Sequence, residues 1–412
     1  MTYAEAERYL LSLELFGMRF GLDRMRRLMT ALGSPQERYG TVHVAGTNGK
    51  SSTVRMTAAI LARHGLRAGA YLSPHLVSFT ERIRVDDTDL SEERFAAAVA
   101  RAKRAAEKVD RTLEEGDRVT QFEALTAAAY SELAEAGADV VVVEAGLGGR
   151  WDATNVIPSK VQVLTNVGLE HTRWLGPTIA DIAAEKLDIV RPGGTLVVGA
   201  DLHEDAMTLA AQVCAERGAT LVVAPADSGL ELLARGEVQQ RNFAVARAAA
   251  EAYHGPLDDA AVVEAAAGTL VPGRFQVVAE APATVIDGAH NAAGMASLAG
   301  SLRTFAAGRP IVAVVSVLDD KDAAGMLREL LPLCTEVVFT QSANPRALPA
   351  GTLESLAGQV GGPPARTVQE PLRALDAARA AAGPGGVVVA TGSIYLIADL
   401  LRPAGARGRS ML

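Results

Sequence analysis

Short apolar runs rich in valine recur along the chain, and segments of helical spacing separate them. In ADVVVVEAG, residues 138–146, four consecutive valines leave no alternation between a polar and an apolar face. A strand of this kind is typical of a parallel sheet that helices cover on both sides. Residues 160–168 and 194–200 repeat the pattern, and residues 92–109 have the spacing of an amphipathic helix. This alternation predicts an α/β fold built on parallel sheets.

A second series of apolar runs begins after GTLVPGRFQVV, residues 268–278, and includes residues 283–291 and 309–318. A chain of 412 residues is long enough for two or three domains. The Pro-Gly pair within GTLVPGRFQVV separates the two series, so we expect one domain over residues 1–272 and another over residues 273–412. We expect the first to be a P-loop ATPase-like parallel sheet with helices, and the second to be a smaller Rossmann-like α/β domain.

Composition excludes several classes of protein. The 48 acidic residues outnumber the 40 basic ones, whereas a general nucleic-acid-binding protein has a basic surface, so we expect no nucleic-acid partner. Only Cys214 and Cys334 are present, too few for a disulfide framework or a cysteine-based zinc site. The N-terminal segment has neither a basic region nor a long apolar run, so we expect no signal peptide, no membrane span and a cytoplasmic location.

The stretch HVAGTNGKSST, residues 43–53, joins a predicted strand to a helix that we expect to begin at Ser52. Backbone N–H groups at such a junction point at one place, and the helix dipole adds about half a positive charge there. Glycine lets the backbone approach a ligand closely, Lys50 supplies a full charge for nucleotide phosphates, and a neighbouring hydroxyl can bind Mg²⁺. The stretch therefore favours a phosphate-binding loop.

This loop matches the pattern G-x-x-x-x-G-K-[ST] only in Gly49, Lys50 and Ser51, because Val44 stands at the first glycine position. The alternative is a tight turn that serine side chains cap and in which the lysine lies on the surface. The order strand, loop, helix favours the phosphate-binding interpretation.

Two further polar residues follow predicted strands. Glu144 ends the valine run, and a carboxylate at the carboxyl end of a parallel strand lies where ligands bind in open α/β sheets and can hold Mg²⁺. The alternative is an acid that caps the strand before the glycine-rich turn. His171 follows another predicted strand beside Glu170, and on the residues alone it fits a metal ligand and a structural histidine equally well.

Nine stretches between residues 41 and 396, in this order, carry a resemblance to a known family: VAGTNGKSST, SPHLVSFTERIRV, FEALTAAAY, EAGLGGRWDATNV, LEHTRWLGPTIADIAAEK, PGRFQVV, IDGAHN, DDKD and TGSIYL. As a set they resemble the folylpolyglutamate synthases and dihydrofolate synthases, which belong to the Mur-type ATP-dependent amide ligases. The resemblance implies a ligase that adds L-glutamate to folates, and to 7,8-dihydropteroate, through an acyl phosphate. It also implies ATP, two Mg²⁺ sites and a monomer without a membrane or nucleic-acid partner.

Roles for individual residues follow from the same resemblance. The residues that it implies for nucleotide binding are Thr47, Asn48, Gly49, Lys50, Ser51, Ser52, Asn242, Arg274 and Asp287. Those implied for metal binding are Ser52, Ser73, Glu144 and His171. Those implied for the pterin site are Thr120, Gln121, Phe122, Trp151, Asp152 and Ala153. Those implied for catalysis are Lys50, Lys186 and His290, the last of which we expect to face the cleft between the domains.

Lys186 matches the lysine that the family carries as a carbamate. Without the resemblance, an exposed helical lysine is the simpler interpretation. The family sequence EKAG is EKLD here, so Asp188 stands two residues from Lys186. Residues two apart on a helix do not face each other, so we expect Asp188 to have little effect on a carbamate.

The chain departs from the family at the phosphate-binding loop. The family usually has glycine after the lysine, whereas this chain has Ser51 there. Ser52 is the positional match to the family's hydroxyl, and Ser51 is the match to the general P-loop pattern, so two candidates for the metal-binding hydroxyl stay open.

The substrate range also has alternatives. Arg19 and Phe20 stand where enzymes that use dihydropteroate often have Asp and Leu, which leaves dihydropteroate open as a substrate. A Mur-type ligase for a nucleotide-sugar peptide needs a recognition domain, and about 40 residues before the loop are too few for one. A P-loop kinase or nucleotide switch is the third candidate, which DGAHN and TGSIYL disfavour.

Overall fold

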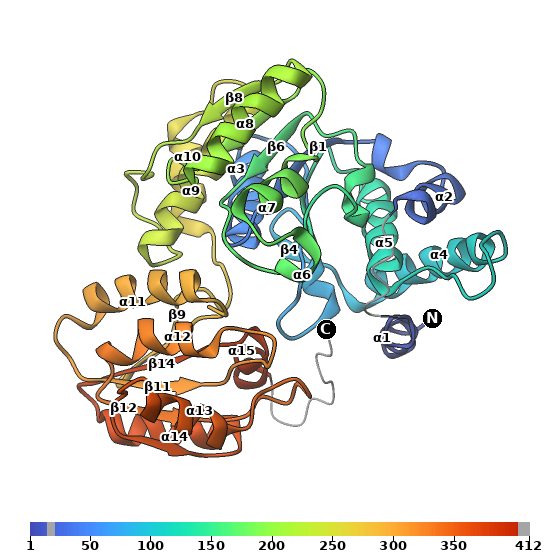
Figure 1. Ribbon diagram of the computed structural model, residues 1–412. Coiled ribbons are helices and arrows are strands. Elements are labelled where there is room, and N and C mark those ends of the chain that lie inside the picture. Colours follow the sequence, from blue (N-terminus) through green and yellow to red (C-terminus); the bar gives the residue numbers. More distant parts are fainter. Residues whose placement is uncertain (15–20, 403–412) are drawn as a thin grey trace. The chain divides into compact units, whose positions relative to one another are not determined.

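The computed structural model describes residues 1–14 and 21–402. Arg19 and Phe20 therefore lie outside the described residues. The described residues form two compact units: the first holds Met1–Leu232 and Gln240–Thr269, and the second holds Leu233–Gln239 and the described residues from Leu270 to Arg402. Both units can be followed in Figure 1 by the labels of their helices and strands.

The first unit is built on an eight-stranded sheet in the order β4-β3-β2-β5-β1-β6-β7-β8. Its strands are β1 (Gly40–Ala45), β2 (Ala68–Tyr71), β3 (Ile83–Val85), β4 (Thr88–Asp89), β5 (Val140–Glu144), β6 (Val161–Leu164), β7 (Thr195–Val198) and β8 (Thr220–Val223). The six strands from β2 to β8 in that order are parallel, and β3 and β4 pair antiparallel at one edge. The four valines of β5 are fully buried, and burying each stabilises the fold by roughly 1.5–3 kcal/mol.

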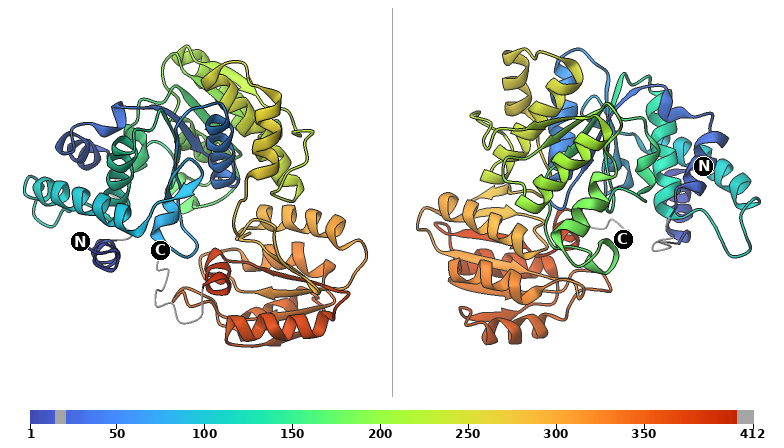
Figure 2. Two further views of the ribbon diagram at one scale, coloured as in Figure 1. Left: turned by 180° about the vertical axis from the view of Figure 1, so that it is seen from behind. Right: turned by 45° about the horizontal axis from the view of Figure 1, so that its top comes forward.

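Helices cover both faces of this sheet. They are α1 (Tyr3–Ser12), α2 (Asp23–Ala31), α3 (Lys50–Arg63), α4 (Glu92–Asp110), α5 (Gln121–Glu135), α6 (Thr172–Leu175), α7 (Ile179–Leu187), α8 (Glu204–Arg217), α9 (Glu237–His254) and α10 (Asp259–Gly268). Short 3-10 turns lie at Pro35–Glu37, Phe79–Arg82 and Ala153–Val156. Figure 1 shows α7 and α8 in front of the sheet, and the reverse view in Figure 2 brings α3 forward. Helices α1, α2, α4 and α5 share one apolar cluster with β2 and β5.

The second unit has a six-stranded sheet in the order β13-β12-β11-β14-β10-β9. Its strands are β9 (Gln276–Glu280), β10 (Ala283–Ile286), β11 (Ile311–Val315), β12 (Glu336–Phe339), β13 (Ala365–Thr367) and β14 (Val387–Thr391). Its helices are α11 (Ala292–Ala306), α12 (Ala323–Leu330), α13 (Ala350–Gln359), α14 (Pro371–Ala382) and α15 (Ile394–Leu401), with a 3-10 turn at Leu331–Leu333. Figure 1 shows α11 and α12 on one face of this sheet and α14 on the other.

The predicted α/β fold is confirmed, with three differences in detail. Strands β3 and β4 form an antiparallel edge, and β9 pairs antiparallel with β10, whereas the sequence predicted parallel strands only. Helix α3 begins at Lys50, two residues before the predicted start.

Among the described residues, no helix is both long enough and apolar enough to cross a membrane.

Candidate active site

The loop between β1 and α3 depends on two glycines with positive φ. Gly46 has a φ of 152°, and a Cβ there would lie 1.9 Å from Thr165 Oγ1. Gly49 has a φ of 83°, and a Cβ there would lie 2.4 Å from Asn242 Oδ1. Any side chain at either position would therefore collide with a neighbour. The second contact also places Asn242, a predicted nucleotide contact on α9, beside the loop.

The segment that follows β6 holds this loop in place. Asn48 N donates to Asn166 Oδ1 at 2.8 Å, and Thr165 Oγ1 donates to the Asn48 carbonyl at 2.6 Å. Gly168 N donates to Thr47 Oγ1 at 3.0 Å, and the same hydroxyl lies 3.3 Å from the Gly168 carbonyl. The ends of two neighbouring parallel strands are thus linked at the position where such sheets bind ligands.

Two lysines share one carbonyl of the loop. Lys50 Nζ donates to Gly46 O and Thr47 O, each at 3.1 Å, and Lys186 Nζ donates to Gly46 O at 2.9 Å. Lys186 is only 5% exposed. Burial, and next the positive charge of Lys50, lower the pKa of Lys186 to about 7. The amine of Lys186 is therefore partly neutral near neutral pH, which an exposed lysine is not.

Glu144 ends β5 and is buried. Its Oε1 accepts a hydrogen bond from Ser51 Oγ at 2.9 Å, and its Oε2 accepts one from the backbone N–H of Ser73 at 3.1 Å. Ser52 is also buried, in the part of α3 that packs against the sheet. The loop hydroxyl that contacts the carboxylate is therefore that of Ser51.

His171 begins α6 with a φ of 52°, and its Nε2 lies 3.7 Å from Glu170 Oε1. Among the described residues, no three His, Cys, Asp or Glu side chains gather as a metal cluster. Mg²⁺ does not require such a cluster, because it keeps several waters and takes one or two carboxylates together with substrate phosphates. A buried carboxylate with a hydroxyl beside it, next to a phosphate-type loop, fits this ion.

Asp188, which we expected to have little effect on Lys186, is paired with two arginines. Its carboxylate accepts a hydrogen bond from Arg217 at 2.6 Å and lies 3.4 Å from Arg150 Nε. The charges that act on the pKa of Lys186 include those of Lys50 and Glu170, and Asp188 is not among them.

The residues predicted for the pterin site lie around the first turn of α5 and the loop after β5. Thr120 caps α5 through a reciprocal pair of hydrogen bonds with Glu123. The buried Gln121 donates from Nε2 to the Leu10 carbonyl at 2.9 Å, so its amide holds α1. Phe122 stacks on Tyr71, with ring centroids 6.3 Å apart.

Phe122 and Asp152 lie on either side of Gly146. A Cβ at Gly146 would be 2.6 Å from Phe122 Cζ and 3.1 Å from Asp152 Oδ2. Asp152 is buried beside the buried Ala153, and burial raises the pKa of its carboxyl. Trp151, the third predicted residue of this loop, is 46% exposed. The structure thus brings an aromatic ring and a carboxyl group together at this point.

The residues that hold Asp152 were not predicted from the sequence. Asp152 Oδ2 accepts from Leu147 N at 2.8 Å, and Oδ1 accepts from both N and Oγ1 of Thr154. Behind them, His43 Nε2 lies 2.8 Å from Thr154 Oγ1. His43 is fully buried in β1, and burial lowers its pKa to about 3, so the ring is neutral. A histidine inside an otherwise apolar strand was the one available signal.

The second unit carries its own cluster at the end of β10. Asp287 accepts backbone hydrogen bonds from Phe275 at 2.7 Å and from Ala289 at 2.8 Å. Burial raises the pKa of Asp287, and the nearby charge of Arg274 opposes that rise. His290 lies 2.9 Å through Nδ1 from the Gly288 carbonyl, so Nδ1 carries the proton and donates. The predicted Arg274, Asp287 and His290 are therefore neighbours.

The loop, the parallel sheet and the second α/β unit define a Mur ligase, and family models agree. The Mur ligase middle domain matches residues 44–222, and the Mur ligase glutamate ligase domain matches residues 273–394. The chain belongs to the folylpolyglutamate synthase/dihydrofolate synthase family of these ligases. A member of that family from Mycobacterium tuberculosis is 36% identical, with 87% of this chain and 82% of that protein covered. One from Escherichia coli is 32% identical, with 97% and 94% covered.

Solved structures agree with this assignment. The Mycobacterium tuberculosis folylpolyglutamate synthase complexed with ADP superimposes with a TM-score of 0.90 at 33% identity, covering 99% of both chains. The Escherichia coli enzyme in complex with DHPP and ADP has a TM-score of 0.87 at 32% identity, covering 97% of both chains. The resemblance inferred from the nine sequence stretches is confirmed.

Proposed function

We propose that this protein is an ATP-dependent ligase that adds L-glutamate to folates, and also to 7,8-dihydropteroate. The observation that carries the proposal is the arrangement at the end of β1. Lys50 and Lys186 both donate to the Gly46 carbonyl, while Ser51 of the same loop reaches Glu144. A phosphate-binding loop with the amines of Lys50 and Lys186 and the buried carboxylate of Glu144 suits the transfer of a phosphoryl group to the carboxylate of a substrate.

The reaction takes place in two steps. A carboxylate oxygen of the folate attacks the γ-phosphorus of ATP, the bond to the bridging oxygen breaks, and ADP leaves. The amino group of glutamate then attacks the acyl carbon, loses a proton, and displaces inorganic phosphate as the amide forms. Negative charge grows on the phosphoryl oxygens, and Lys50 neutralises it from the loop. Two relatives solved in complex with ADP support ATP as a substrate.

Thr47, Asn48 and Gly49 present the loop backbone to the phosphates, with Asn242 beside Gly49. Glu144, Ser51, Ser73 and His171 are the proposed metal-binding residues. Mg²⁺, when bound, neutralises phosphate charge and fixes the phosphate geometry. Between the two serines we propose Ser51, because its hydroxyl contacts Glu144 whereas Ser52 is buried under the helix.

Lys186 is proposed to carry a carbamate. Its neutral amine attacks CO₂, a nitrogen–carbon bond forms, and one proton is released to solvent. The lowered pKa of about 7 favours this step, because only the neutral amine is nucleophilic. The product replaces a cation by an anion beside the Gly46 carbonyl, so it requires a positive charge nearby. Lys50 lies within hydrogen-bonding distance of the same carbonyl.

Phe122 and Asp152, with Thr120 and Trp151 close in sequence, are proposed to bind the pterin. A ring system with several N–H donors suits an aromatic face together with a buried carboxyl group. The Escherichia coli relative was solved in complex with DHPP as well as ADP, which supports a second small-molecule substrate besides the nucleotide. Arg274 and Asp287 are proposed for nucleotide binding, and His290 is proposed for catalysis. We also propose residues 1–272 and 273–412 as the two domains.

The test measures phosphate release from ATP and Mg²⁺ with tetrahydrofolate or dihydropteroate, in the presence and absence of L-glutamate. We expect release only when both substrates are present, together with a product heavier by one glutamyl residue. Release that is independent of glutamate, or the absence of a glutamylated product, would overturn the ligase assignment.

A further inference from the structure

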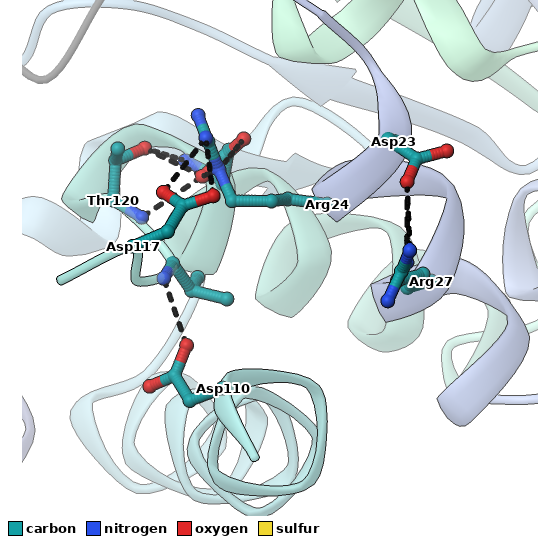
Figure 3. Close-up of polar contacts among 8 residues, drawn as sticks. Asp23, Arg24, Arg27, Asp110, Asp117 and Thr120 are labelled. Atoms are coloured by element: carbon teal, nitrogen blue, oxygen red, sulfur yellow. Dashed lines mark hydrogen bonds and ion pairs between the residues drawn. The ribbon is translucent and has the colours of Figure 1, made fainter. Parts of the chain in front are cut away.

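Arg24 lies on the first turn of α2. Its side chain is 10% exposed and joins two carboxylates from different parts of the chain (Figure 3). Nε lies 3.1 Å from both oxygens of Glu123, on α5, and Nη1 lies 3.1 Å from Asp117 Oδ1, in the loop before α5. Burial disfavours the guanidinium charge, but the two carboxylates outweigh it and leave the pKa of Arg24 raised.

Glu123 transmits this contact to the start of α5. Its Oε2 accepts hydrogen bonds from Thr120 N at 2.9 Å and from Thr120 Oγ1 at 3.0 Å. Asp110, at the end of α4, accepts from Val119 N at 2.9 Å, so the incoming loop is held one residue earlier as well (Figure 3). Arg24 therefore fixes the end of the loop and the first turn of the helix together.

Phe122 lies within this turn, between Gln121, which is hydrogen-bonded to α1, and Glu123, which is hydrogen-bonded to α2. Gln121 bonds to the Leu10 carbonyl on one side, and Glu123 bonds to Arg24 on the other. The Phe122 ring lies beside Gly146, where the Asp152 carboxyl group also lies. A shift of the first turn would move this ring away from the carboxyl group that is proposed to bind the pterin.

We infer that Arg24 is a positioning residue for the pterin end of the substrate. By joining Asp117 to Glu123 it holds the first turn of α5, and hence Phe122, against the loop that carries Asp152. Without the guanidinium, two largely buried carboxylates would face each other and repel, which would displace the turn. The inference rests on the proposed function and assigns to Arg24 an effect on folate binding rather than on nucleotide binding.

Arg27, on the same helix as Arg24, provides a matched control. Arg27 pairs with Asp23 one turn along α2, at 3.0 Å, but these side chains are 46% and 75% exposed (Figure 3). The Arg27→Met variant removes the same charge from α2, together with two hydrogen bonds to Thr112, and leaves the contacts of Asp117 and Glu123 in place. Exposed pairs of this kind contribute little to stability.

The experiment compares steady-state constants of Arg24→Met, Arg24→Lys and Arg27→Met in the full chain. For Arg24→Met we expect the KM for the folate or pteroate substrate to rise about tenfold or more, with the KM for ATP within about twofold of the parent. Arg24→Lys should lie between, because one ammonium cannot bond two carboxylates as a planar guanidinium does. Arg27→Met should match the parent.

Equal rises of both KM values, or an unchanged folate KM in Arg24→Met, would overturn the inference. If Arg24→Met does not fold, Asp117→Asn provides the same test, because it removes one arm of the contact at a less buried position. The parent enzyme separates the two proposals. A parent that ligates no pteroate or folate contradicts the proposed function, whereas an active parent with unaffected Arg24 variants contradicts only the role of Arg24.

Discussion

The hydroxyl of Ser51 lies 2.9 Å from Glu144 Oε1 and joins the phosphate-type loop to the end of the neighbouring strand. The contact exists because α3 begins at Lys50, which places the following residue on the side of the helix that faces β5. Ser52, one residue on, is turned into the core and buried. The residue at which α3 begins thus decides whether the hydroxyl of Ser51 or that of Ser52 reaches the Glu144 carboxylate.

The first prediction compares these two serines. Ser51→Ala should raise the Mg²⁺ concentration needed for half-maximal ligation by about tenfold or more, since it removes a hydroxyl that is hydrogen-bonded to the carboxylate proposed to bind the metal. Ser52→Ala should leave that concentration near the parent value. The measurement is a Mg²⁺ titration of glutamate-dependent phosphate release at saturating ATP. A larger shift for Ser52→Ala would contradict the assignment.

The second prediction concerns Lys50. Lys50→Ala should lower the rate of ligation by about 100-fold or more, because it removes the charge that neutralises the transferring phosphoryl group. Its thermal unfolding temperature should stay close to that of the parent, since the ammonium hydrogen-bonds to two carbonyls of its own loop in the part of the chain that the structure describes. Lys108→Ala, at an exposed position on α4, is the control. Near-normal turnover of Lys50→Ala would refute the loop assignment.

The third prediction follows from the buried amine of Lys186. Its pKa in the folded protein is about 7, below the ordinary lysine value of 10.5, so the unfolded chain binds more protons between these two values. The free energy of unfolding of the parent should therefore rise with pH across this range. The destabilisation caused by the buried charge of Lys186 is fully present below about pH 7. Lys186→Met should raise the unfolding temperature at about pH 6, and the gain should shrink at about pH 9.

Buffers free of CO₂ are required for that comparison, because a carbamate would remove the amine. A gain that is equal at both pH values would contradict the lowered pKa. In activity assays Lys186→Arg should be nearly inactive, because a guanidinium cannot form the carbamate. A fully active Lys186→Arg enzyme would exclude the carbamate while leaving the pKa result unaffected.

The fourth prediction concerns the buried path from His43 to Asp152. Thr154→Val removes the hydroxyl that lies between the two and leaves His43 Nε2 without its acceptor. We expect the free energy of unfolding to fall by about 1–3 kcal/mol in urea denaturation, the cost of an unsatisfied buried polar group. Thr154→Ser keeps the hydroxyl and should lose less. Equal stability of Thr154→Val and the parent would show that the path does not contribute.

Several features of this site could be predicted from the sequence because they depend on local pattern. The valine run of β5 requires burial on both faces, and that places Glu144 at the carboxyl edge of the sheet. The glycines around Lys50 specify a loop before a helix in the same way. The α/β class and the family followed from such patterns, and both are confirmed.

Other features depend on contacts between distant segments. Lys186 is an ordinary helical lysine in the sequence, and only packing against the loop at Gly46 makes it buried. Arg24 and Glu123 are 99 residues apart, so no local pattern relates them. The antiparallel edge strand β9 was missed because its pairing with β10 follows a short turn that gives no strong signal. The domain limits and the roles of the site residues stay predictions.

The most direct test of the ligase mechanism is isotope transfer from the folate. A folate or pteroate labelled with oxygen-18 in its reacting carboxylate is incubated with the enzyme, ATP, Mg²⁺ and L-glutamate, and the released phosphate is analysed by mass spectrometry. The acyl-phosphate mechanism predicts that one labelled oxygen appears in each phosphate, because the carboxylate oxygen that attacks ATP leaves with the phosphate. Glutamylated product accompanied by unlabelled phosphate would contradict it.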